Sequence, residues 1–391
     1  MLTKLYSKVK FSGIWLDMNE LANFCDGACR PAAGSYKYDY SKDLPYQPGS
    51  DNIESHTISL NATHYGNVSE ADVHVFSAFL ETYATNQFLK YKTLRPFIIT
   101  RSSTLGSNKF GFHWTGDNSA RWEYLRGSIA DNFNSQLFGF QMVGPDICGF
   151  GGNTNPELCA RWFQLGAVYT FARNHNDLES ISQEPYALGD VVLQAAKKNL
   201  KLRYSLLKYF YLEFVNKHGL GSIFRPLFFD YPLDSNTYVD DIADTQFLIG
   251  ANLLVAPIVE QGQTSRKVYL PQSNWYDFHT GKKYTPGTHL LQNIGLTDLV
   301  PIFVREGFVM ISQDTTNVVN TKQLNNRFTI LSGMRYDTRR SNATTKIYEA
   351  VGGALSVKDL NDEPLVDRCL REGCEYVINL LARISNTERT L

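Results

Sequence analysis

Short apolar runs that end at a polar residue alternate with helical segments through the first 219 residues of this chain. Gly13–Leu16 stops at the carboxylate of Asp17, and Phe110–Trp114 is followed closely by Asp117. A buried parallel strand has this pattern when its last residue emerges into a pocket. Alternating strands and helices with polar strand exits are typical of a (β/α) barrel, whose chemistry lies at the carboxyl ends of the strands.

Five predicted strand exits end in a polar side chain, and all five are candidate site residues. They are Asp17, Arg101, Asp117, Asp146 and His175. The helical periodicity predicts helices at Asp72–Lys92, Arg121–Asn132, Glu157–Thr170 and Val191–His218, with Gly219 placed to end the last.

After residue 219, short β-rich runs are separated by Gly, Pro and Asn, which predicts an antiparallel β-sandwich. The runs are Ile223–Tyr231, Asn252–Val259, Arg266–Leu270, Trp275–Phe278 and Val300–Ile311. A chain of 391 residues is expected to form two or more domains. We expect the domains to be 1–219, 220–311 and 312–391.

The charge balance and hydropathy exclude several classes of partner. The net charge is −1, from 38 basic and 39 acidic residues, so nothing attracts nucleic acid or an anionic membrane surface. The sequence has no apolar stretch of the roughly 18 residues that a membrane-spanning helix needs. We therefore expect neither a nucleic acid partner nor a membrane segment in this chain.

The six cysteines favour an oxidising compartment. They fall as three close pairs, namely Cys25 with Cys29, Cys148 with Cys159, and Cys369 with Cys374. Acceptor sequons for N-glycosylation begin at Asn61, Asn67 and Asn342. Together these features indicate the secretory pathway. A zinc site is the alternative for the cysteines, but no Cys-x-x-Cys spacing or nearby His pair supports it, so no metal is expected.

An indole precedes a carboxylate at two of the predicted strand ends, where Trp15 is followed by Asp17 and Trp114 by Asp117. Indole faces cover the apolar side of a sugar ring, and carboxylates bind hydroxyls or perform acid/base chemistry. This combination suggests a site for a neutral polyhydroxylated ligand and points to glycoside cleavage.

Each acidic residue also has a structural alternative. Asp17 can attack an anomeric carbon or cap a helix, and Glu20 can tune Asp17 or complete a capping box. Asp117 can protonate a leaving oxygen, since burial would raise its pKa, or it too can cap a helix. Arg101 and Asp146 can form an ion pair or bind sugar hydroxyls, and His175 can donate to a hydroxyl or be structural.

Four strings together resemble glycoside hydrolase family 31, most closely its α-glucosidases of the lysosomal acid maltase and sucrase–isomaltase type. They are Trp15-Leu-Asp-Met-Asn-Glu20, His113-Trp-Thr-Gly-Asp-Asn118, Gly144-Pro-Asp-Ile-Cys-Gly-Phe150 and Phe171-Ala-Arg-Asn-His-Asn176. The endoplasmic-reticulum glucosidase II type usually differs in the last string. The resemblance extends from about residue 11 to about residue 310.

The resemblance implies roles for individual residues. It implies a retaining mechanism with Asp17 as nucleophile, Asp117 as acid/base and Glu20 as a second acid beside the nucleophile. The substrate-binding positions that it implies are Arg101, His175, Trp15, Met18, Trp114, Asp146 and Phe150. It further implies a family disulfide between Cys148 and Cys159, with Cys25–Cys29 as a second.

The family has a β-domain and three barrel strands before the Asp17 segment, and this chain begins just ahead of that segment. The expected fold is therefore α/β, a partial (β/α)8 TIM barrel of strands 4–8 followed by C-terminal antiparallel β-sandwich domains. An acidic turn of the family near the C-terminus is replaced by Tyr348-Glu-Ala-Val-Gly-Gly353.

The resemblance implies an exo-acting α-glucosidase, without metal or cofactor, that removes terminal α-linked glucose from maltose-like or starch- and glycogen-like chains in a lysosomal or extracellular setting. One alternative is an inactive fragment or carbohydrate-binding remnant that lacks the first barrel strands. Another is a structural subunit that completes its barrel with a second polypeptide.

Overall fold

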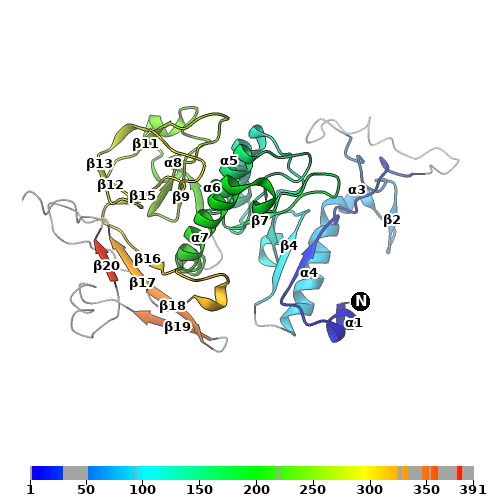
Figure 1. The fold of residues 1–391 in the computed structure, drawn as a ribbon. Helices are drawn as coiled ribbons and strands as arrows, with labels where there is room; N and C mark the ends of the chain where they lie inside the picture. Colours follow the sequence, from blue (N-terminus) through cyan, green and yellow to red (C-terminus); the bar gives the residue numbers. More distant parts are fainter. Residues whose placement is uncertain are drawn as a thin grey trace, which may run out of the picture. The chain divides into compact units, whose positions relative to one another are not determined.

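The computed structural model describes residues 2–29, 52–92, 95–217, 221–324, 328–332, 346–351, 354–359 and 377–380. The chain divides into two compact units, residues 1–114 and 115–391, whose elements are labelled in Figure 1. Among these described residues, no helix is both long and apolar enough to cross a membrane. Asn342, Cys369, Cys374 and Gly219 lie outside the described residues.

The first unit is built on a parallel sheet of three strands. Its strands are β1 (Gly13–Leu16), β4 (Phe97–Thr100) and β5 (Phe112–His113), in the order β1-β4-β5. Leu16 pairs with Thr100, and Thr100 pairs with His113. Since the strands run parallel, the residues that follow β1 and β4 emerge at the same edge of the sheet.

Helices follow the first strand along the chain. The predicted helix at Asp72–Lys92 is interrupted. It consists of α3 (Glu70–Val73), the 3₁₀ turn η1 (His74–Phe76) and α4 (Ser77–Lys90). The remaining elements among the described residues of the unit are α1 (Leu2–Lys8), β2 (Thr63–His64), β3 (Val68–Ser69) and η2 (Ser107–Lys109). Leu89 of α4 is buried against Leu16 and Ile98, which anchors this helix to the sheet.

The second unit begins with three α-helices, one 3₁₀ helix and two short parallel strands among its described residues. In chain order these are α5 (Trp122–Leu137), β6 (Asp146–Ile147), α6 (Pro156–Gly166), β7 (Arg173–Asn174), η3 (Pro185–Leu188) and α7 (Asp190–Asn216). The Asn155 side chain accepts a hydrogen bond from the Leu158 amide at 3.0 Å and Pro156 opens the helix, which is a favourable start for α6.

A β-rich region follows α7. Its largest sheet has the order β13-β12-β15-β10-β9-β8, and smaller sheets pair β11 with β14 and β16 with β17 and β20. The strands of the six-stranded sheet are β8 (Phe224–Pro226), β9 (Phe247–Ile249), β10 (Leu253–Val255), β12 (Trp275–Asp277), β13 (Lys283–Tyr284) and β15 (Ile302–Arg305). The other elements are α8 (Leu227–Asp230), η4 (Ser235–Tyr238), β11 (Arg266–Leu270), β14 (Gly287–Leu291), β16 (Val309–Gln313), η5 (Thr321–Gln323), β17 (Phe328–Ser332), β18 (Lys346–Val351), β19 (Ala354–Asp359) and β20 (Val377–Leu380).

One predicted strand was wrong in part. Ile223–Tyr231 divides at Pro226 into the strand β8 and the one-turn helix α8. Proline has no N–H to donate to a strand partner, and the apolar run after it does not distinguish a strand from a buried helix. The β-rich run Val300–Ile311 covers β15 and the start of β16, which extends to Gln313.

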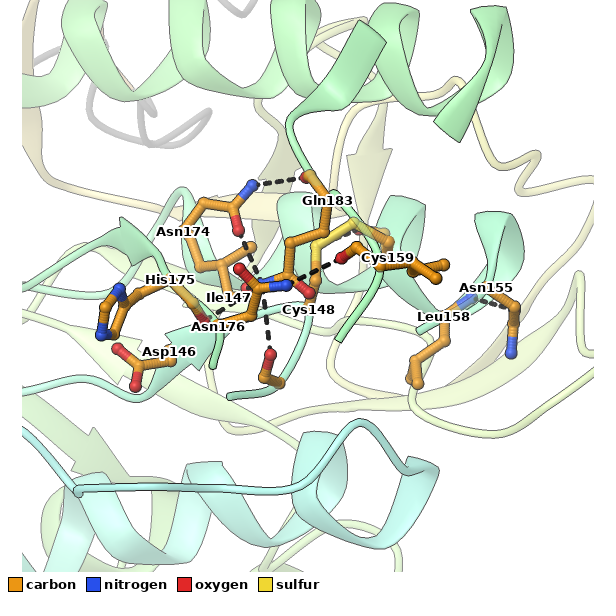
Figure 2. Close-up of a disulfide and its surroundings, with 12 residues drawn as sticks. Asp146, Ile147, Cys148, Asn155, Leu158, Cys159, Asn174, His175, Asn176 and Gln183 are labelled. Carbon is orange, nitrogen blue, oxygen red and sulfur yellow. Dashed lines mark hydrogen bonds between the residues drawn. A yellow bond between two sulfur atoms is a disulfide. The ribbon is translucent and has the colours of Figure 1, made fainter. Parts of the chain in front are cut away.

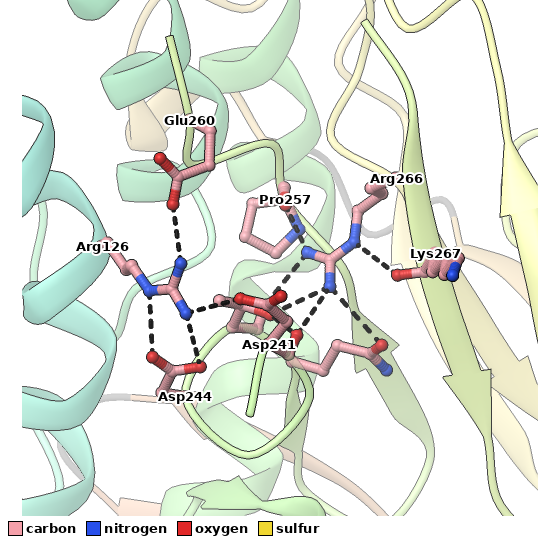
Figure 3. A network of polar contacts seen from close by, with 9 residues as sticks. Arg126, Asp241, Asp244, Pro257, Glu260, Arg266 and Lys267 are labelled. Atoms are coloured by element: carbon pink, nitrogen blue, oxygen red, sulfur yellow. Dashed lines mark hydrogen bonds and ion pairs between the residues drawn. The ribbon is translucent and has the colours of Figure 1, made fainter. Parts of the chain in front are cut away.

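Charged side chains join the helices of the second unit to its β-rich region. Arg126 of α5 forms ion pairs with Asp241, Asp244 and Glu260 at 2.7, 3.0 and 2.7 Å (Figure 3). Burial alone would lower the pKa of Arg126, but hydrogen bonds to these three carboxylates raise the pKa above its usual value. Arg266 nearby donates instead to backbone carbonyls, and burial lowers its pKa to about 10.

A buried glutamine makes a second connection between these regions. Gln164 of α6 is 2% exposed, and its Nε2 donates to the backbone oxygens of Gly295, Leu296 and Asp298 at 3.0, 3.1 and 3.0 Å. Its Oε1 accepts from Arg161 at 2.9 Å. Gln164 therefore helps to hold the loop before β15. Arg161 also donates to the oxygens of Ile294 and Gly295, and Asn199 donates to that of Asp298.

We predict that Gln164→Leu lowers the free energy of unfolding by about 1–3 kcal/mol, because it removes a buried amide that donates to three partly buried carbonyl oxygens and accepts from Arg161. Denaturant unfolding of the two proteins measures the difference. The control is Gln261→Leu at an exposed loop position, which should change the free energy by less than about 0.5 kcal/mol. Equal effects of the two substitutions would contradict the role of Gln164.

Candidate active site

In the first unit, one arginine holds two of the predicted acidic residues. Arg101 Nη1 lies 3.0 Å from Asp17 Oδ1, Arg101 Nε lies 3.3 Å from Glu20 Oε2, and Nη2 contacts the other oxygen of Glu20. The Arg101 side chain is 21% exposed and each carboxylate 34%. The exits of β1 and β4 thus form one acid–arginine cluster that solvent, or a ligand, can reach.

A buried asparagine fixes the loop between these acids. Asn19 is 4% exposed, donates to Thr100 Oγ1 at 2.6 Å and accepts from the Ser102 amide at 2.9 Å. It therefore ties the segment after β1 to the segment after β4. No helix begins at this segment, so the capping alternatives for Asp17 and Glu20 are wrong.

Aromatic and apolar side chains lie beside this cluster. Trp15 and Trp114 pack edge to face, with ring centroids 5.6 Å apart and an interplanar angle of 62°. Trp114 is 1% exposed, whereas Trp15 and Met18 are each 47% exposed. An exposed indole supported by a buried one offers a rigid apolar surface of the kind that covers the C–H face of a sugar.

In the second unit, a fully buried carboxylate is paired with an arginine from the neighbouring strand. Asp146 Oδ1 accepts from Arg173 Nε at 2.9 Å and from Arg173 Nη2 at 2.6 Å. The Asp146 side chain is 0% exposed. Sequence reasoning did not assign a role to Arg173, although an arginine in a short strand beside a buried acid is a detectable signal.

Asp117 is exposed and follows Gly116, whose φ of +77° is readily adopted only by glycine. The next residue, Asn118, donates to the Asp146 carbonyl at 3.0 Å and accepts from the Asp146 amide at 3.2 Å. This reciprocal pair anchors the Asp117 segment to β6. The N-cap of α5 is Arg121, so the capping alternative for Asp117 is also wrong.

Phe150 and His175 contact each other at the exits of β6 and β7, with ring centroids 5.2 Å apart. The disulfide Cys148–Cys159 links the β6 exit to α6, and Gln183 lies between the exits of β6 and β7 (Figure 2). The structure also contains the disulfide Cys25–Cys29, in the segment after β1. Both predicted disulfides are therefore present, and Cys148–Cys159 ties the β6 exit, which carries candidate site residues, to α6.

Two of the predicted glycosylation sites lie within the described residues. Asn67 is exposed in the turn between β2 and β3 and has a φ of +63°, while Asn61 is partly buried just before β2. Glycosylation at both positions stays a prediction.

The strand ends define a class of protein, namely an α/β protein whose parallel strands deliver acids, arginines and aromatic rings to their carboxyl ends. The chain matches the glycosyl hydrolases family 31 TIM-barrel domain over residues 1–213 and the family 31 C-terminal domain over residues 221–310. The chain belongs to glycosyl hydrolase family 31. Its fold is therefore that of the family TIM-barrel domain followed by a C-terminal β domain.

The similar proteins include several α-glucosidases. The chain is 34% identical to a lysosomal acid alpha-glucosidase from Tetrahymena pyriformis, in an alignment that covers 100% of this chain and 46% of the relative. It is 43% identical to a probable alpha-glucosidase from Oryza sativa subsp. japonica, in an alignment that covers 70% of this chain and 31% of the relative. The chain thus spans less than half the length of these relatives. A crystal structure of a glucosidase II alpha subunit, Tris-bound, matches with a TM-score of 0.75 and 25% identity over 96% of this chain and 40% of that one.

His113, at the end of β5, is a titratable group of the site region whose pKa changes when the protein folds. Burial lowers the pKa of His113, although its contacts with the backbone of Thr100 and Arg101 oppose this. The folded protein thus favours neutral His113, while the unfolded chain binds a proton near pH 6.5. The contribution of neutral His113 to the free energy of unfolding is therefore complete above pH 6.5 and is lost as the pH falls below that value.

We therefore predict that His113→Asn reduces the loss of stability between about pH 6.5 and pH 5. Thermal unfolding of both proteins across this range measures the effect. His289→Asn is the control, because this histidine lies in β14, away from the site region, and is partly exposed. If the wild-type and His113→Asn proteins lost stability in parallel as the pH fell, the buried neutral histidine would be refuted.

Proposed function

We propose that this chain contributes the catalytic residues of a retaining, exo-acting α-glucosidase. In this proposal Asp17 attacks the anomeric carbon while Asp117 protonates the departing glycosidic oxygen. A covalent glycosyl-enzyme forms on Asp17. Asp117 then removes a proton from water, which hydrolyses that bond and releases glucose with its α-configuration retained.

The observation that carries this proposal is that Arg101 forms ion pairs with both Asp17 and Glu20 at the exit of β1. A guanidinium fork fixes a carboxylate in orientation, as a nucleophile requires. Trp15 and Met18 would cover one face of the glucosyl ring, with Trp114 packed behind Trp15. Arg101 and His175 would bind the hydroxyls of the sugar, and Asp146 and Phe150 would complete the lining of the pocket. The loss of the capping alternatives for Asp17 and Asp117 also favours catalytic roles.

The substrate proposed is a maltose-like oligosaccharide or a starch- or glycogen-like chain, cleaved at its terminal non-reducing glucose. Relatives named as α-glucosidases support this class. The secretory pathway, with a lysosomal or extracellular destination, is supported by two disulfides and by a relative named as lysosomal. The partial barrel of strands 4–8 and the domains 1–219, 220–311 and 312–391 are part of the same proposal.

We predict that the 391-residue chain releases α-glucose from maltose and from a chromogenic α-glucoside, which glucose assay and proton NMR of the first product anomer will detect. Asp17→Asn should abolish turnover. Asp117→Asn should lower kcat by about 10²–10⁴-fold, and less with a leaving group that needs no protonation. Asp240→Asn, at an exposed carboxylate, is the matched control and should retain full activity.

Two outcomes would contradict this proposal. Release of β-glucose as the first product would exclude retention, and turnover by Asp17→Asn would exclude the nucleophile. Binding of maltose by the wild-type chain without any turnover would instead support the alternative of a carbohydrate-binding remnant.

A further inference from the structure

Gln183 lies where the exits of β6 and β7 come together. It is 3% exposed and follows the loop that leaves His175. Its Nε2 donates to the carbonyls of Ile147, Gly149 and His175 at 3.3, 3.1 and 3.0 Å, and to Asn174 Oδ1 at 2.9 Å (Figure 2). One amide nitrogen thus donates hydrogen bonds to four oxygens at two strand exits.

The orientation of this amide is fixed by chemistry. Four acceptors converge on one end of the side chain, so that end must carry the two N–H groups, which are shared among the oxygens. The other end, Oε1, is buried and has no hydrogen-bond partner within the described residues. The Gln183 carbonyl in turn accepts from Asn174 Nδ2 at 2.8 Å, so Gln183 and Asn174 hold each other.

Each backbone carbonyl that Gln183 binds belongs to, or is adjacent to, a residue of the proposed sugar site. Ile147 follows Asp146, Gly149 precedes Phe150, and the third carbonyl is that of His175 itself. In the view of Figure 2, Asp146 and His175 lie together at one side of the Gln183 cluster. A shift of this amide would therefore move all three site residues of this unit together.

We infer that Gln183 is a positioning residue, which sets the geometry of Asp146, Phe150 and His175 toward a glucosyl ring without touching that ring. The inference rests on the proposed function. Its physical basis is that carbonyl oxygens repel one another when no donor lies between them. Without the amide, the two exits would separate until water reached them.

The test compares two buried glutamines of the same unit. Gln183→Leu should weaken binding of 1-deoxynojirimycin, a glucose-configured iminosugar, by about 100-fold, and should lower kcat/KM to a similar extent. Gln164→Leu is the matched control, since it also removes an amide that binds three backbone carbonyls and is also buried. It should destabilise the protein but leave binding unchanged. Equal weakening in both variants would overturn the inference.

Gln183→Glu gives a signature that a merely structural role would not produce. A carboxylate among four oxygens is repelled, and burial raises the pKa of such a group, whereas the protonated acid has one O–H to donate. Iminosugar binding by this variant, relative to the wild type, should therefore recover as the pH falls. A ratio that does not change with pH would contradict the inference. If Gln183→Leu does not fold, iminosugar binding by Gln183→Glu at low and at neutral pH replaces it as the test.

Hydrogen exchange separates this inference from the proposed function. If the wild-type chain binds no iminosugar and hydrolyses no glucoside, the proposed function fails, yet the clamp is still measurable. Backbone amides of residues 147–151 and 174–176 should exchange faster in Gln183→Leu, and those of residues 294–298 should exchange faster in Gln164→Leu. Unchanged exchange at both strand exits in Gln183→Leu would overturn the positioning role.

Discussion

The pairing of carboxylates with arginines at the ends of parallel strands is the interaction on which the candidate site depends. An apolar strand that ends in an acid brings a charge to the border of the core, where an unpaired carboxylate is costly. Arg101 meets this need for Asp17 and Glu20 in the first unit, and Arg173 meets it for Asp146 in the second. The same pairs that make these charges tolerable also fix their orientation.

Neutral amides extend this principle from the charged side chains to the backbone. Asn19 joins the exits of β1 and β4, Asn118 joins the Asp117 segment to β6, and Gln183 joins the exits of β6 and β7. Each amide satisfies main-chain or hydroxyl groups that would otherwise be buried without partners. The loops that carry the candidate site residues are therefore held by side chains that have no role in the proposed chemistry, an arrangement that pre-organised sites require.

Much of the fold and of the candidate site could be predicted from the sequence, because apolar runs and their polar ends are local signals. The strand Arg266–Leu270 formed with the predicted bounds, and β1 and β4 delivered Asp17 and Arg101 to a common sheet edge. The division of Ile223–Tyr231 was missed because an apolar run of that length suits a strand or a buried helix equally. Gln183 gave no signal, since a single amide in a loop shows no periodicity, and its partners are set only by the return of the chain.

In the proposed mechanism, Asp17 and Asp117 act on opposite sides of one glycosidic bond. The most direct test is a crystal structure of this protein with glucose bound, in which the separation of the two carboxyl groups is measured. The account predicts a separation of about 5–5.5 Å with the glucose between them. A separation of about 6.5 Å or more, or a glucose bound away from both carboxyl groups, would contradict it.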